Sequence, residues 1–111
     1  MNATALEGGL TGADDGVDAA IRQRIGNRTR EAFGVRARAL LVREIAQTID
    51  GRLVFAVLVQ RDAEECDRKA TYSVHEWAEP YPEAGPRNGL YSQGRYDLRL
   101  EEAAEDWLRR R

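Results

Sequence analysis

Residues Leu53 to Val59 form an unbroken apolar run, Leu-Val-Phe-Ala-Val-Leu-Val. Successive side chains of a strand point to opposite faces of its sheet, so this strand carries apolar groups on both faces. Both faces of the sheet therefore need a cover that excludes water. The chain's own helices can supply one cover, and we expect the second face to be the best clue to function.

A hairpin turn is predicted directly before this run. Asp50-Gly51 is a pair preferred in two-residue type I′ turns, and it separates two β-rich stretches, Arg38 to Ile49 and Arg52 to Arg61. Such a turn predicts the pairs Ile49 with Arg52, Thr48 with Leu53, Ala46 with Phe55, and Val42 with Val59.

This register divides the apolar residues between two faces. The predicted core face holds Leu40, Val42, Ala46, Leu53, Phe55, Val57 and Val59. The second face is half apolar with a polar rim, and we interpret seven of its residues as an interface: Leu41, Arg43, Ile45, Gln47, Ile49, Val54 and Leu58. Its cover is the N-terminal helix on the opposite side from the closing helix, a second copy of the chain, or a foreign protein.

The segment before the hairpin predicts a tail and one helix. Residues 1 to 13 hold three glycines and few large apolar residues, so they are interpreted as a mobile tail, with a single domain over 14 to 111. Asp14 or Asp15 can cap the following helix, and Gly34 is a natural stop. Gly26-Asn27 leaves open whether this helix is continuous.

Two more strands and a closing helix are predicted after the hairpin. Arg68 to Ala78 alternates like a strand, a Pro-rich loop follows, and Leu90 to Tyr96 can add a short edge strand. The closing helix begins near Leu98, and its apolar stripe is Leu100, Ala103, Ala104, Trp107 and Leu108. An α+β fold of order αβββα follows, with a three- or four-stranded antiparallel sheet and both helices expected on one face.

The αβββα order resembles the double-stranded RNA-binding domain, whose closing helix also carries an Ala-Ala pair like Ala103-Ala104. The resemblance implies the fold. In that family, lysines at the start of the closing helix bind phosphates, but here Glu101 and Glu102 occupy those places and would repel them.

Two charged surfaces are candidates for binding. The basic cluster comprises Arg22, Arg24, Arg28, Arg30, Arg36 and Arg38, which could contact phosphates or an acidic protein. The acidic surface comprises Asp62, Glu64, Glu65, Asp67, Glu101, Glu102 and Glu105, which could occupy a nucleic-acid-binding groove.

The sequence gives little sign of catalysis. His75 is the single histidine, and we find no phosphate-binding loop, dinucleotide turn or nucleophile elbow. We predict no catalytic residue, metal site or cofactor. The net charge of −2 indicates no general attraction to anionic surfaces, and no apolar run approaches a membrane span. A cytoplasmic location is the default expectation.

Aromatic residues beside the Pro-rich loop, Trp77, Tyr81, Tyr91 and Tyr96, either anchor an interface or cover the end of the core. The short, Ala- and Arg-rich acidic chain, with Gly94-Arg95-Tyr96-Asp97-Leu98 before its closing helix, resembles small accessory proteins of bacteriophages and mobile elements, among them anti-CRISPR inhibitors. That resemblance implies stoichiometric blocking of a host defence complex. A nucleic-acid-binding regulator and a homodimeric module are the alternatives.

Overall fold

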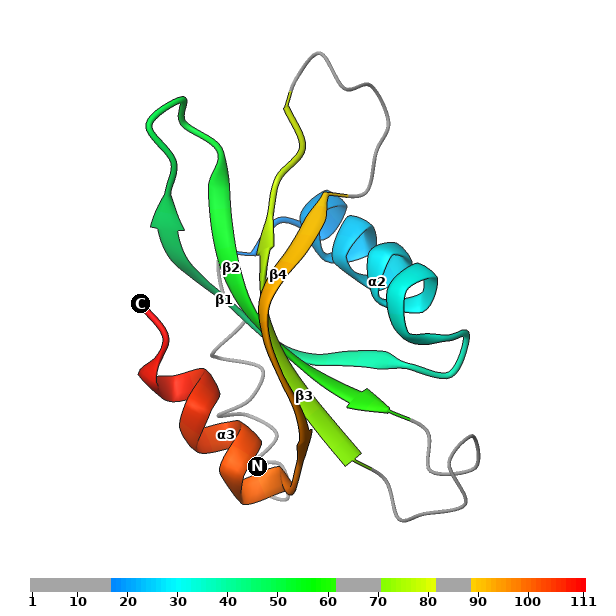
Figure 1. Ribbon diagram of the computed structural model, residues 1–111. Helices are drawn as coiled ribbons and strands as arrows, with labels where there is room; N and C mark the ends of the chain where they lie inside the picture. Colours follow the sequence, from blue (N-terminus) through cyan, green and yellow to red (C-terminus); the bar gives the residue numbers. More distant parts are fainter. Residues whose placement is uncertain (1–16, 62–70, 82–88) are drawn as a thin grey trace, which may run out of the picture.

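The computed structural model describes residues 17–61, 71–81 and 89–111. The tail over 1–13, the caps Asp14 and Asp15, the acidic stretch 62–67 and most of the Pro-rich loop lie outside these ranges. The elements are α2 (Ala19–Phe33), β1 (Arg38–Gln47), β2 (Leu53–Arg61), β3 (Thr71–Ala78), β4 (Leu90–Leu98) and α3 (Leu100–Arg109). The strands form one antiparallel sheet in the order β1-β2-β3-β4, which confirms the α+β prediction (Figure 1).

α2 is one continuous helix through Gly26-Asn27. Its N-cap is Asp18, whose side chain accepts a hydrogen bond from the Ala20 backbone at 2.7 Å. Gly34 ends it as predicted, with φ at 110° and its N–H donating to the Arg30 carbonyl.

The hairpin turn has three residues, so the predicted two-residue turn is wrong. The Gly51 N–H donates to the Thr48 carbonyl at 2.9 Å, and the Thr48 N–H donates to the Arg52 carbonyl at 2.8 Å. Gly51 has φ at 89°, as expected for a type I turn followed by a glycine bulge. The strands therefore begin with Gln47 opposite Leu53, one residue away from the predicted register.

Two irregularities in β1 shift the register further, at Leu40 and Ile45. In the middle of the hairpin Val42 faces Val57 and Leu41 faces Leu58, so the predicted pair of Val42 with Val59 is wrong. The predicted division into faces survives there, because the turn and the bulge at Ile45 each shift the register by one residue. Two consecutive one-residue shifts return each side chain to its original face.

The two helices cover opposite faces of the sheet, which corrects the expectation that both lie on one face (Figure 1). The core under α2 consists of Ile25, Ala37, Val42, Phe55, Val57, Val59 and Trp77. The core under α3 consists of Leu41, Ala56, Leu58, Val74, Leu98, Ala103 and Trp107. Because β2 is apolar on both faces, one helix on each side buries its middle, from Phe55 to Val59.

Some residues of the predicted core face and of the predicted apolar stripe of the closing helix are exposed in the structure. Leu40 lies at a bulge and is 38% exposed, and Ala46 is also exposed. In the closing helix only Ala103 and Trp107 are buried, whereas Leu100 and Leu108 are 51% and 63% exposed. The stripe is therefore wider than the surface that α3 packs against.

Candidate functional site

α3 covers only part of its sheet face, and this decides which predicted interface residues are accessible. Leu41 and Leu58 lie in the core beneath Trp107, with exposed fractions of 6% and 0%. The prediction that these two residues line an interface is wrong, because the closing helix packs on them. Of the three covers that the sequence left open, the one with the two helices on opposite sides of the sheet is therefore found, and the closing helix is the one that lies on this face.

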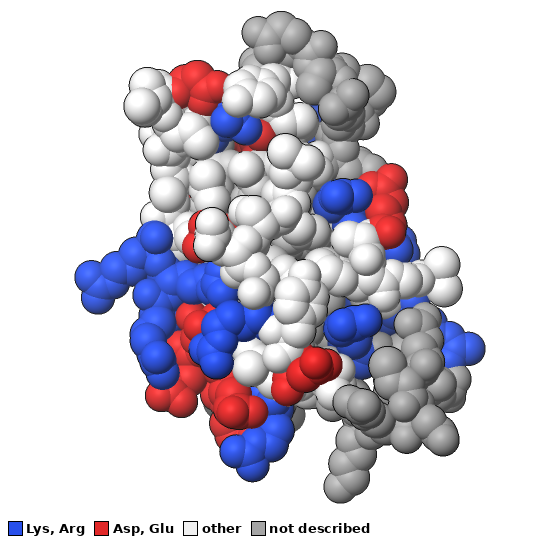
Figure 2. Space-filling view, in the orientation of Figure 1, with Lys and Arg blue, Asp and Glu red and all other residues white. Residues whose placement is uncertain are grey.

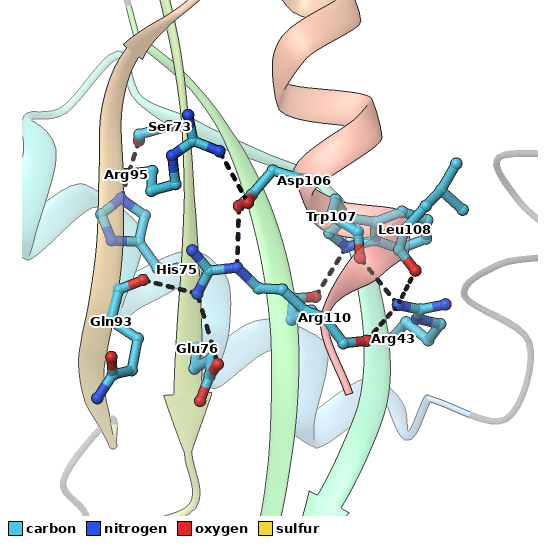
Figure 3. A network of polar contacts seen from close by, with 11 residues as sticks. Arg43, Ser73, His75, Glu76, Gln93, Arg95, Asp106, Trp107, Leu108 and Arg110 are labelled. Atoms are coloured by element: carbon cyan, nitrogen blue, oxygen red, sulfur yellow. Dashed lines mark hydrogen bonds and ion pairs between the residues drawn. The ribbon is translucent and has the colours of Figure 1, made fainter.

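Arg43 was also predicted as an interface residue, and it holds the end of α3 instead (Figure 3). Its Nη2 donates to the carbonyl oxygens of Trp107, Leu108 and Arg110 at 2.8, 3.3 and 2.9 Å. The last carbonyls of a helix lack partners within the helix, so the guanidinium satisfies them and opposes the helix dipole. The Trp107 indole N–H donates to the Ala56 carbonyl at 3.0 Å, which fastens the same turn to β2.

The remaining predicted interface residues lie beyond the end of α3. Ile45 is partly buried against the α3 core, and Val54 is half-buried. Gln47 is exposed and its side chain donates to the Gly51 carbonyl at 3.2 Å. Ile49 is fully exposed at the hairpin tip.

Four apolar residues form one row across all four strands on this uncovered part of the face. Ala46 pairs with Val54, Val54 with Ala78, and Ala78 with Leu90. Directly paired residues share a face. Val54 lies two and four residues before Ala56 and Leu58 of the α3 core, so it shares their face, and the row lies on the α3 side. We call Ala46, Val54, Ala78 and Leu90 the apolar strip. Leu90 is 63% exposed.

The hairpin tip borders the strip on one side. The Arg52 guanidinium lies over the Tyr81 ring, 3.9 Å from its centre, and donates to the Glu79 carbonyl at 3.0 Å. Asp50 accepts hydrogen bonds from Thr48 and Arg52; the Thr48 hydroxyl is the larger cause of the lowered pKa of Asp50. Tyr81 remains 53% exposed.

The C-terminal end of α3 borders the strip on the other side. Arg43 pairs with Ala56 and Ala56 with Glu76, which is the row next to the strip on this face. Arg110 reaches this row, contacting Glu76 at 3.5 Å and the Gln93 carbonyl at 2.6 Å (Figure 3). Figure 2 shows the result: a largely uncharged region over the upper half of the sheet, above the basic end of α3.

The predicted acidic surface is only partly described. Asp62, Glu64, Glu65 and Asp67 lie outside the described residues. On α3, Glu102 accepts from the Arg99 backbone, which is the main cause of its lowered pKa, and Glu105 pairs with Arg109 at 2.9 Å. Glu101 is exposed in the first turn. Acidic and basic side chains alternate here, as Figure 2 shows.

The predicted basic cluster is spread around α2 and the turn after it. Arg22 and Arg24 are two positions apart, so they point to different sides of the helix. Arg28 lies 3.8 Å from Glu31, and Arg30 donates to Asn27. Arg36 and Arg38 follow the helix and are exposed.

The single histidine lies in the α2-side core. His75 Nε2 and Ser73 Oγ are 2.9 Å apart, and both residues are almost fully buried. The imidazole packs against Phe33, Tyr91 and Tyr96 at 4.6 to 5.3 Å between ring centres. Burial, with smaller effects of Arg110 and Arg61, lowers the pKa of His75 to about 4. This geometry resembles a nucleophile–base pair, but it is sealed from solvent and serves the core.

No known protein family, curated protein or solved structure matches this chain. Within residues 17–61, 71–81 and 89–111, no helix has both the length and the apolar content needed to cross a membrane.

Sequence reasoning missed three of the four strip residues. It placed Ala46 on the core face and assigned no role to Ala78 or Leu90. Recognising the row requires the pairing of β3 with its two neighbours, and the long connections on either side of β3 give no register signal comparable to a hairpin turn.

Proposed function

We propose that this protein is a non-catalytic binding protein that associates with another protein through the apolar strip. The observation that carries the proposal is the row itself: four apolar residues, one from each strand, on the half of the sheet face that α3 leaves open. Adjacent strands are separated by about 4.8 Å, so the row is about 14 Å long.

The composition of the borders supports an interface. Tyrosine and arginine are enriched among residues that dominate binding energy, and Arg52 and Tyr81 stand stacked beside the strip. Arg52 is held by Asp50 and by the Glu79 carbonyl, so its position is fixed before binding. A prearranged anchor loses little side-chain entropy on association.

The sheet edges are less suited to receive a partner strand. β1 is irregular at Leu40 and Ile45, and β4 contains two non-glycine residues with positive φ, Gln93 and Asp97. Arg110 also donates to the Gln93 carbonyl. Bulges interrupt the hydrogen-bond ladder of an edge and disfavour pairing with another chain. This favours association through the face.

The resemblance to small phage accessory proteins makes a host defence complex the first foreign partner class to test. In this narrower form of the proposal the protein blocks such a complex stoichiometrically. The expected signature is complete inhibition at one equivalent of protein, and inhibition that needs a large excess contradicts it.

Affinity capture from the native host tests the association surface. Leu90→Asp places a charge on the strip, and Leu100→Asp places the same charge on a similarly exposed leucine at the distant start of α3. We expect proteins, untagged copies of this chain included, to be retained by the wild type and by Leu100→Asp and lost with Leu90→Asp. Identical captured sets for the two variants contradict the proposal.

A further inference from the structure

We infer that the apolar strip binds the apolar strip of a second copy of this chain, in a two-fold, face-to-face pair. This inference depends on the proposed function, since it names the occupant of the same surface. Three features of the face support it: the step formed by α3, the symmetry that this step permits, and the charges at its two borders.

The depth of the step fits a second sheet. α3 lies on one half of the face and ends at the row that contains Arg43 and Glu76, so the strip lies beside a wall one helix thick. A helix is about 10 Å across, and two packed sheets are also separated by about 10 Å. A second sheet laid on the strip therefore fills the layer that α3 fills on the other half.

Only one of the two simple two-fold arrangements keeps each α3 away from the α3-covered half of the other sheet. An axis parallel to the strands would keep α3 of both copies at the same end, so that each α3 would collide with the other sheet, whose layer it occupies. An axis parallel to the strip reverses the strand direction, so that α3 of each copy lies at the hairpin-tip end of the other. Each strip residue then faces its own counterpart, and the interface is isologous, as a closed dimer requires.

The charges of the two borders are complementary in this arrangement. The α3 end carries three arginines, Arg109, Arg110 and Arg111, against two carboxylates, Glu105 and Asp106, with which Arg109 and Arg110 pair. The hairpin tip carries Asp50, with 47% of its side chain exposed, beside a single arginine, Arg52, and Glu79 lies next to the tip at the end of β3, where its carboxylate accepts from the Leu53 N–H. Rotation about the strip axis brings the basic end of one copy to the acidic tip of the other, and like charges remain at opposite ends.

Disulfide cross-linking tests the pair directly. In a Cys66→Ser background, Val54→Cys puts a thiol on the axis, and Leu100→Cys puts one on the far end of α3. We expect Val54→Cys to form a covalent dimer about 100-fold faster than Leu100→Cys under the same mild oxidant, because the paired thiols share a high effective concentration.

Equal rates for the two variants, or no dimer with either, overturn the second-copy inference. If capture from the host still depends on Leu90 in that case, the proposed function stands and the occupant is a foreign protein. If capture is also independent of Leu90, the strip is not an association surface and both proposals fail.

Discussion

The guanidinium carbon of Arg43 lies 4.8 Å from the centre of the Trp107 ring, and the same guanidinium donates to the Trp107 carbonyl oxygen at 2.8 Å. A side chain from edge strand β1 thus holds both the indole and the backbone of the last turn of α3. This contact fixes where the helix ends, and therefore where the uncovered half of the sheet begins.

Arg43→Ala should destabilise the fold by about 2 kcal/mol, because it removes hydrogen bonds from a charged donor and a cation–π contact. Arg43→Lys should lose less, since an ammonium can still reach a carbonyl but cannot fork between several. Urea unfolding monitored by tryptophan fluorescence gives both values. Equal stability of wild type and Arg43→Ala would show that the contact does not hold α3.

Two residues of β2 on the same face should respond differently to substitution by lysine. Leu58 is fully buried under α3, whereas Val54 lies in the strip beyond the helix. Leu58→Lys should unfold the protein, because a lysine there loses its hydration without a partner. Val54→Lys should stay folded within about 1 kcal/mol of wild type, because a lysine at this half-buried position can extend its ammonium group into water. Circular dichroism melts separate the two, and a folded Leu58→Lys would contradict the position of α3.

This contrast also shows what the sequence could and could not predict. Alternation in β2 predicted two apolar faces, and the positions of Leu58 and Val57 on opposite faces are confirmed. The register was wrong because Asp50-Gly51 fits both a two-residue turn and a three-residue turn with a glycine bulge. The bulges at Leu40 and Ile45 have no sequence signature of their own.

The prediction that both helices pack on one face was wrong for a related reason. The apolar stripes of both helices fit either face, so helix periodicity alone does not choose between them. The information lay in β2, whose two apolar faces require one cover each. Of the strip, the sequence predicted only Val54: the wrong register put Ala46 on the other face, and Ala78 and Leu90 become neighbours of Val54 only through the pairing of three strands.

Burial of His75 should make stability depend on pH. Its pKa is about 4 in the folded protein against 6.5 in the unfolded chain, so below pH 6.5 the unfolded state binds a proton that the native state does not. The stability that neutral His75 allows is therefore fully present above pH 6.5, and the free energy of unfolding falls as the pH decreases from 6.5 toward 4. We expect a loss of about 2 kcal/mol between about pH 7.5 and pH 5.

The matched variant for this measurement is His75→Gln, whose amide can still bond to Ser73. It should have a lower stability that is nearly constant over the same pH interval. An unchanged slope in His75→Gln would assign the pH dependence to other groups.

Two glycine-to-alanine changes should have opposite signs. A Cβ at Gly94 would lie 2.6 Å from His75 Nδ1 and 2.9 Å from the Tyr96 ring, so Gly94→Ala should cost about 1–3 kcal/mol by overpacking. A Cβ at Gly26, inside α2, meets only Arg30 at 3.7 Å. Gly26→Ala should stabilise by about 0.5–1 kcal/mol through helix propensity. Thermal unfolding of both variants gives the signs, and a stabilised Gly94→Ala would refute the close packing of His75.

The mass of the purified protein in solution is the most direct test of association through the strip. Each chain has a mass of 12.5 kDa, so a face-to-face pair has twice that value. Sedimentation equilibrium across a range of concentrations should show wild type and Leu100→Asp converging on the mass of two chains, with Leu90→Asp remaining at the mass of one and keeping its native circular dichroism. A wild type that stays at the mass of one chain at every concentration, or a Leu90→Asp variant that pairs as the wild type does, would contradict the pairing of two strips.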